Sequence, residues 1–512
     1  MANAEHLKLL MTDEWARWRQ ANPRLLPDLV EADLRGADLR GVDLARAVLT
    51  RCELQGANLA GASLVNAHVE GAYFENTNLD GCDCTGVKLD LLELQSCSFR
   101  GATFTGATFR GSNMSGCNLS GAKLSQVNLE GAILDRADLT GADLTGATLR
   151  GARMDGANLT GANLTSANLE NVSLAGNKMV GANLENAYVQ RAQLVGADLE
   201  RVKATRANFR EANLLRANLA HGVFDWTDFT NATLKSANCE DARFVNCDMA
   251  TVDLRESVLL NATFDNVQMP GASLAGLDLR APRIGKVVLV KANMSGCVLR
   301  GVQFRKIRMD GARLEGADLR EANLEGAILD GAYLSGVEMR STRMRSASLV
   351  GAVLADADIS GCDLILANLS EADCTRTDFR FTRLVGAECR KAHFQWADLR
   401  NADFTNASVG GASFWGARMM NTKLPWQAFF WKVIVGASTV FIVARRRREE
   451  RQKRDHARRI RDTVRLVERL EARDPRLRRI AAAINAAPAR DGVAPRESPA
   501  SREPARVPED ED

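Results

Sequence analysis

Cysteine, histidine and carboxylate side chains are the groups in this 512-residue chain that could bind a metal or transfer protons. Cys82 and Cys84, with Asp83 between them, have a spacing compatible with a redox or metal site. The five histidines are dispersed, and the sequence contains no cysteine pairs at zinc spacing, no G-x-S-x-G, no P-loop and no H-E-x-x-H motif. The sequence therefore predicts no enzyme activity, no cofactor and no metal site.

Most of these cysteine, histidine and carboxylate side chains lie within a five-residue repeat, which must determine their positions. From Leu34 to Leu424 every fifth residue is Leu, Phe, Met, Ile, Val, Cys or Ala, which makes 79 consecutive pentads. A small or apolar residue, usually Ala, stands two positions earlier, and a slot two positions later holds 35 of the 40 glycines. A period of five fits neither a helix nor a strand. Each pentad must therefore be a short extended segment followed by a turn.

The arrangement Ala-(Asp/Asn)-Leu-x-Gly gives each segment one apolar side. Residues two apart in an extended segment point to the same side, so Ala and Leu face inward and the polar residues face outward. Glycine then allows the chain to bend, and four bends would close a square. All 11 cysteines occupy the two inward slots, which predicts small core residues rather than ligands. An odd number of thiols without a signal peptide favours a reducing cytoplasm.

The motif resembles that of the pentapeptide repeat family, A(D/N)LxG, over residues 30–424. This resemblance implies an all-β solenoid, a right-handed quadrilateral β-helix with four pentads in each 20-residue coil. At a strand spacing of about 4.8 Å, roughly 20 coils would make a rod about 95 Å long. Residues 1–29 are predicted to be an N-terminal helical cap, with one amphipathic helix over 5–20.

Coils of 20 residues would bring charged side chains into columns. Six arginines recur at this interval: Arg280, Arg300, Arg320, Arg340, Arg380 and Arg400. Acidic residues stand two positions before five of these arginines and before Ser360, which takes the place of an arginine in the column: Asp278, Asp318, Glu338, Asp358, Asp378 and Asp398. We expect an ion-pair ladder, because the alternative, a phosphate-binding ridge, would not need acids beside it.

A second candidate surface lies between residues 201 and 270, where the glycine slot contains no glycine. Arg201, Arg206 and Arg216 predict a basic cluster, with Trp226 beyond it as an exposed anchor. Exposed aromatic and arginine side chains are typical of protein-binding sites, so this is a candidate partner surface. The alternative is a solvent-exposed surface in which the repeats have diverged from the motif and bind no partner. Pro282 occupies an inward Ala slot and predicts a local distortion.

The repeat ends at Leu424, and a hydrophobic segment with a polybasic flank follows at 425–448. Its apolar part, 426–444, leads to Arg445, Arg446, Arg447 and Arg448. Three interpretations remain: a membrane span, a helix lying on an anionic membrane, or docking on the rod. Docking is favoured, because Trp396 and Trp415 should share a corner that Phe429 and Phe430 could cover. Residues 449–487 predict basic amphipathic helices, with a homodimer as one possible use, and 488–512 predict a disordered tail.

The charge balance restricts the function. Residues 30–424 carry 42 Lys and Arg against 46 Asp and Glu, so direct nucleic-acid binding is not expected. We predict a non-enzymatic, cytoplasmic scaffold that binds other proteins, and the C-terminal segment is a possible site of membrane contact. The sequence does not identify the protein partner. The alternatives are a DNA-mimicking protein that binds gyrase, as the resemblance to quinolone-resistance members implies, and a membrane-associated factor anchored by 426–444.

Overall fold

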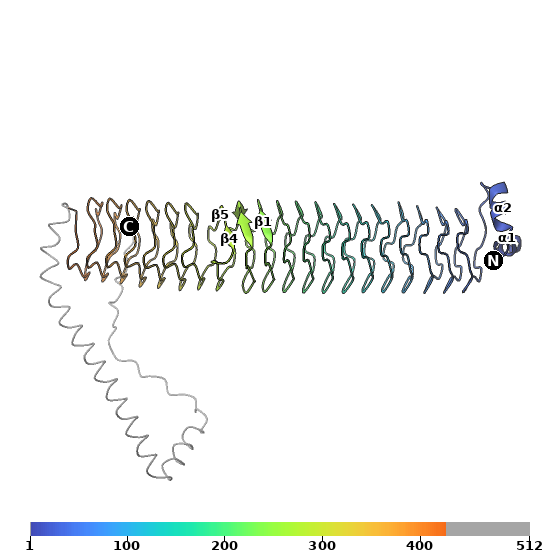
Figure 1. Ribbon diagram of the computed structural model, residues 1–512, viewed down its shortest axis with the longest axis horizontal. Coiled ribbons are helices and arrows are strands. Elements are labelled where there is room, and N and C mark those ends of the chain that lie inside the picture. The colour runs from blue at the N-terminus through green and yellow to red at the C-terminus, as the bar shows by residue number, and fades with distance from the viewer. Residues whose placement is uncertain (1, 426–512) are drawn as a thin grey trace, which may run out of the picture. The chain divides into compact units, whose positions relative to one another are not determined.

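The computed structural model describes residues 2–425, and from Asp28 onward these residues form coils stacked along one axis (Figure 1). Each coil contains 20 residues, because parallel bridges join one outward residue of most pentads to the residue 20 positions later, from Asp28 with Val48 to Asp403 with Lys423. The predicted β-helix solenoid is confirmed. Contacts divide the chain into Met1–Gly436 and Ala437–Asp512, and the second unit lies outside the described residues.

One pentad shows how the wall of the solenoid is built. The Leu159 N–H donates to the Lys178 carbonyl in the next coil at 2.6 Å, and the Asn158 N–H donates to the Ala137 carbonyl in the previous coil at 2.9 Å. Leu159 is fully buried, with 0 % of its surface exposed. Inward side chains therefore form the core, and the backbone satisfies its hydrogen bonds between coils.

The corners of the coil adopt a left-handed backbone whether or not glycine is present. All 35 glycines of the slot have positive φ, and so do 42 other residues, including Trp226 at 60°. Stacking of the coils fixes this conformation, although side chains other than glycine are strained in it. A bulky corner side chain also lies over the glycine one coil later: a Cβ added to Gly416 would be 2.5 Å from the Trp396 ring.

Within residues 2–425, strands of two or three residues occur only between 243 and 288, at and before the coil that contains Pro282. The strands β1 (Arg243–Val245), β2 (Thr263–Asp265) and β4 (Arg283–Ile284) form one parallel sheet, and β3 (Val267–Gln268) pairs with β5 (Val287–Val288). Next to β4, Pro282 supplies no N–H for the hydrogen bond that crosses a regular corner. The flanking corner residues Ala281 and Lys286 lack the positive φ of the regular corners. The distortion predicted at Pro282 is therefore present.

The N-terminal segment forms two helices, α1 (Ala4–Leu10) and α2 (Trp15–Ala21), rather than the single helix predicted over 5–20. Both helices lie at the N-terminal end of the stack (Figure 1). The Trp15 Nε1–H donates to the Asp43 carbonyl at 2.9 Å, and the Arg19 guanidinium donates to the Asp43 carboxylate at 3.2 Å. Trp15 is buried in the same cluster as the first coils. The helix pair thus packs directly on the solenoid.

The inward cysteines do more than fill space. Seven of them occupy the Ala slot, and each donates its S–H to the backbone carbonyl 23 residues earlier: Cys52, Cys82, Cys97, Cys117, Cys247, Cys297 and Cys362. Six threonines in this slot donate in the same way: Thr77, Thr227, Thr342, Thr377, Thr382 and Thr422. The prediction that these cysteines act only as small apolar residues was incomplete.

Asn177 breaks this rule, and it provides a stability test. It occupies the Ala slot, is 0 % exposed, and neither its Oδ1 nor its Nδ2 has a hydrogen-bond partner. We expect Asn177→Thr to raise the free energy of unfolding by about 1–2 kcal/mol, because a hydroxyl could donate to the Met154 carbonyl and no amide would remain unpaired. Urea denaturation measures the change, with Lys178→Thr at the adjacent exposed, outward position as the control. A lower midpoint for Asn177→Thr would contradict the assignment.

Candidate interaction surface

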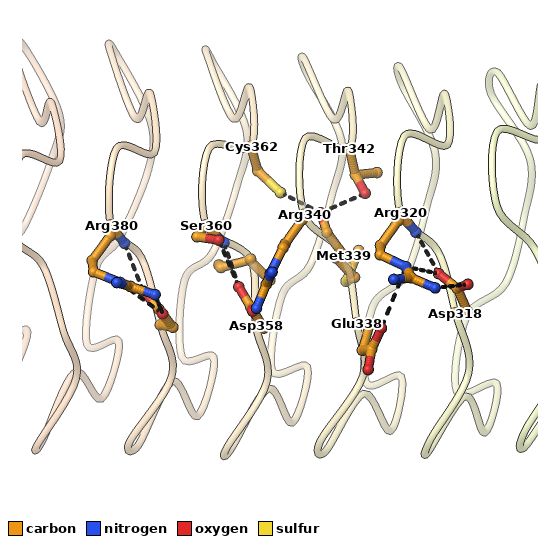
Figure 2. A network of polar contacts seen from close by, with 12 residues as sticks. Asp318, Arg320, Glu338, Met339, Arg340, Thr342, Asp358, Ser360, Cys362 and Arg380 are labelled. Carbon is orange, nitrogen blue, oxygen red and sulfur yellow. Dashed lines mark hydrogen bonds and ion pairs between the residues drawn. The ribbon is translucent and has the colours of Figure 1, made fainter.

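The six arginines of the ladder lie in one column, and each contacts a carboxylate. Arg280, Arg320, Arg380 and Arg400 each bind the aspartate two residues earlier at 2.6 Å. Arg340 binds Asp358 in the next coil and Arg300 binds Glu321, also at 2.6 Å. Figure 2 shows Arg320 between Asp318 and Glu338, with Arg340 extending to Asp358. The acidic and basic side chains therefore neutralise one another along the column.

The arginines also hold their aspartates ionised. Hydrogen bonds from Arg320 lower the pKa of Asp318, and Arg280 lowers the pKa of Asp278 in the same way. At Asp398 burial is the largest effect and raises the pKa, but hydrogen bonds and charge from Arg400 outweigh it, so the pKa is lowered. These pairs are surface pairs that mainly relieve repulsion between stacked like charges. The column is a poor candidate for binding phosphate.

The lowered pKa values predict loss of stability in acid. A carboxylate whose pKa is depressed in the folded state stabilises the fold above its unfolded value, near 3.9, and this contribution is lost as the pH falls through the folded value. Arg35 lowers the pKa of Asp33 to about 2, so the window extends from about pH 4 to about pH 2. We expect the melting temperature to fall across this window.

The variant Asp318→Asn provides the comparison for this acid loss. It should melt slightly lower than the unmodified chain at pH 7 and show a shallower fall in acid, because its ion pair with Arg320 is absent at every pH. The difference at pH 7 should shrink in about 1 M salt. A salt-independent difference would indicate a packing role instead.

The predicted cluster of Arg201, Arg206 and Arg216 is not one patch. Successive pentads occupy successive sides of a coil, so these residues lie at three different corners, with Arg206 and Arg216 diagonally opposite. Their closeness in sequence was misleading for this reason. Arg206 shares its corner column with Trp226 one coil later, and Trp226 is 60 % exposed. The pair Arg206 and Trp226 remains a candidate for partner contact.

A second aromatic pair lies near the end of the repeat. The rings of Trp396 and Trp415 meet edge to face, with centroids 4.6 Å apart and an angle of 75°. Trp415 is 60 % exposed. The 20-residue coil brings the two residues together, because they are 19 positions apart at one corner. This places an aromatic patch beside the last coil.

The C-terminal predictions concern residues outside the described range 2–425. They include the docking residues Phe429 and Phe430, the polybasic residues Arg445, Arg446, Arg447 and Arg448, and the segments 449–487 and 488–512. Among residues 2–425, neither helix approaches the length and apolar character of a membrane span.

The cysteines have the environment of core residues. Burial raises the pKa of Cys239 to about 12, which disfavours the reactive thiolate. The Cys82 S–H donates to the Leu59 carbonyl at 2.7 Å. Within residues 2–425, no group of three His, Cys, Asp or Glu side chains is arranged to hold a metal ion.

A family model described as pentapeptide repeats (8 copies) matches more than half of the chain. The matched segments lie within residues 28–250 and within residues 286–424. HetL, a pentapeptide repeat protein involved in heterocyst differentiation regulation from the cyanobacterium Nostoc sp. strain PCC 7120, is 27 % identical. The match covers 50 % of this chain and 90 % of HetL, with a TM-score of 0.20. QnrB1, a plasmid-mediated fluoroquinolone resistance protein, is 20 % identical over 48 % of this chain and 95 % of QnrB1, with a TM-score of 0.21. No curated protein matches the sequence.

Proposed function

Because the chain belongs to the pentapeptide repeat family, we propose that it is a non-enzymatic scaffold whose outward side chains bind other proteins. The inward positions are filled along the described coils, so binding has to use the outer surface. That surface is rigid, since each coil is hydrogen-bonded to both neighbours. A rigid array of outward side chains suits protein recognition.

Exposed apolar side chains at strained corners carry this proposal. Leu91, Trp226, Leu366 and Phe381 have φ near 60° and are between 60 % and 79 % exposed. Glycine would adopt this backbone without strain, and a polar residue would be better hydrated. Neither burial nor backbone geometry therefore accounts for large apolar residues here. Backbone strain combined with an exposed apolar surface points to a function, and protein binding is the simplest one.

Trp226→Gly tests the proposal. Glycine relieves the corner strain, so we expect the variant to fold with unchanged or slightly higher stability while losing proteins that crosslink to the unmodified chain in its own cells. Asn171→Gly is the matched control, because Asn171 occupies a similar left-handed corner and is exposed, but its side chain is polar. Proteins lost with Trp226→Gly and retained with Asn171→Gly support the scaffold function. An identical set from all three chains would contradict binding at Trp226.

We further propose that residues 426–444 cover the C-terminal end of the solenoid. Val409, Ala412 and Met419 are only partly buried, whereas their equivalents in earlier coils are closed off. The N–H groups of Val409 and Met419 have no acceptor among residues 2–425. An apolar segment that begins directly after this open edge is suited to covering it.

Flotation with anionic liposomes separates this docking from membrane binding. We expect the full-length chain to remain soluble, and deletion of residues 426–512 to cause aggregation through the exposed end. Salt-sensitive flotation that disappears on deletion would instead assign the segment to the membrane.

A further inference from the structure

A band with basic but no acidic residues encircles the solenoid at the distorted coil. Residues 279–309 contain eight lysines and arginines and no aspartate or glutamate. Four of the eight pair with acids outside the band, namely Arg280, Arg300, Arg305 and Arg308, so the excess positive charge rests on the other four. Elsewhere in residues 30–424 the charges are mixed, with 34 basic and 46 acidic residues. The band includes β4, β5 and Pro282, where the coil departs from the regular corner geometry.

The hydrogen-bonded wall is interrupted in this band. Among the described hydrogen bonds, none joins the backbone of 281–286 to that of 300–306. The same side two coils later is closed: the Leu324 N–H donates to Arg343 at 2.7 Å and the Gly326 N–H to Arg345 at 2.8 Å. Pro282 has no N–H, and both corners of its side lack the left-handed backbone. These changes separate one side of two neighbouring coils.

The separation exposes groups that are covered in regular coils. Ile284, an inward residue, is only partly buried, and it lines a small apolar cavity with Phe264 and Leu279. The Ile284 N–H and the Gln303 carbonyl, which would pair in a regular coil, have no partner among the described residues. A donor, an acceptor and an apolar side chain are therefore available at one place.

Cations surround this opening. Arg283, Lys286 and Lys306 are exposed, and none of them has an ion-pair partner among the described residues. Arg305 is held by Glu325 at 3.1 Å. The Asp265 carboxylate accepts from the Lys286 backbone N–H at 3.2 Å. After these two acids are counted, the surface keeps an excess of positive charge.

We propose that this opening binds an extended acidic segment of a protein partner. The gap site is defined by Arg283, Ile284, Lys286, Gln303, Arg305 and Lys306. The backbone of an extended peptide can pair with the free N–H and carbonyl, while its carboxylates meet the surrounding cations. The proposal rests on the scaffold function and specifies the chemistry of one partner.

The dimensions of the band favour a peptide over a nucleic acid. Its residues span about one and a half coils, or roughly 7 Å along the axis at 4.8 Å per coil. Acids stand on both sides of it, including Asp253 and Glu256 before and Asp318 and Glu325 after. A duplex carries one charge per about 1.7 Å and would extend over these acids. A short acidic segment can occupy the band alone.

Fluorescence anisotropy with the full-length chain tests the gap site. The probe is a labelled peptide of alternating glutamate and threonine, with a lysine–threonine peptide and single-stranded oligo(dT) as comparisons. We expect Arg283→Glu combined with Lys306→Glu to weaken binding of the acidic peptide by at least about ten-fold. The control, Arg110→Glu with Lys123→Glu, makes the same charge change on regular coils and should alter binding by less than about two-fold.

Hydrogen exchange supplies a second measurement, because electrostatic attraction of the peptide alone would not protect a particular backbone amide. The amide of Ile284 should exchange faster than that of Leu324 in the free chain and become protected by the acidic peptide. Equal weakening by both double variants, tighter binding of oligo(dT), or binding without protection of Ile284 would overturn the proposal. Because the probe is synthetic, these outcomes leave the crosslinking test of the scaffold function unaffected.

Discussion

Replacing Leu159 by aspartate is expected to lower the free energy of unfolding by about 5 kcal/mol, the largest effect of any change considered. Leu159 is fully buried, and its neighbours in the column one coil away, Leu139 and Met179, are fully buried too. A carboxylate there would lose its hydration without gaining a partner, and the cavity left by leucine would add to the cost. The damage should extend to both adjacent coils, because each coil is stabilised by its neighbours.

Lys178→Ser is the matched control for Leu159→Asp. Lys178 bridges to Asn158 on the same side of the solenoid, but its side chain is exposed and makes no hydrogen bond among the described residues. Its replacement should change stability by less than about 0.5 kcal/mol. Asn158 itself would be a poor control, since its amide donates to the Thr140 hydroxyl at 2.7 Å. Equal losses from Leu159→Asp and Lys178→Ser in urea denaturation would contradict the assigned faces.

Trp15→Ala should cost about 3–5 kcal/mol at the N-terminal end of the solenoid. The indole is 4 % exposed, packs at 5.1 Å from the Trp18 ring, and donates to the Asp43 carbonyl. Its loss removes a large buried side chain and leaves that carbonyl without its donor. We therefore expect α1 and α2 to detach and the first coil to become exposed.

Amide exchange and light scattering measure this detachment. Amides near Leu29 and Leu34 should exchange faster in Trp15→Ala, and the chain should associate at concentrations where the unmodified chain is monodisperse. Arg17→Ala provides the comparison, because Arg17 lies on α2 but is exposed. Unchanged exchange in Trp15→Ala would show that the helices do not protect the first coil.

The repeating parts of the fold were predictable because one physical requirement recurs in every pentad. The 20-residue interval places Arg320 and Arg340 in one column, and the structure adds the carboxylate each one binds. Which residues share a surface patch was harder to predict, because it depends on the corner of the coil that each residue occupies. Arg201, Arg206 and Arg216 are close in sequence, yet the coil distributes them around its perimeter.

The gap site shows a different limit. Pro282 signalled a distortion, but the sequence did not show that both flanking corners would lose their left-handed backbone or that the hydrogen bonds to 300–306 would be absent. The run of eight cations would have been a usable signal, because no acid interrupts residues 279–309. The hydrogen bonds from the Ala-slot cysteines were also invisible, since they depend on a carbonyl 23 residues earlier.

The opening at Pro282 also affects how the solenoid unfolds. In a stacked array, cooperativity depends on the contact energy between adjacent units, so the weakest junction sets the boundary between blocks that melt together. One side of the junction between 281–286 and 300–306 lacks its backbone bonds, while the other sides keep theirs. Two blocks, one on each side of this junction, should thus act as separate foldons, and a molecule under tension would yield first between them.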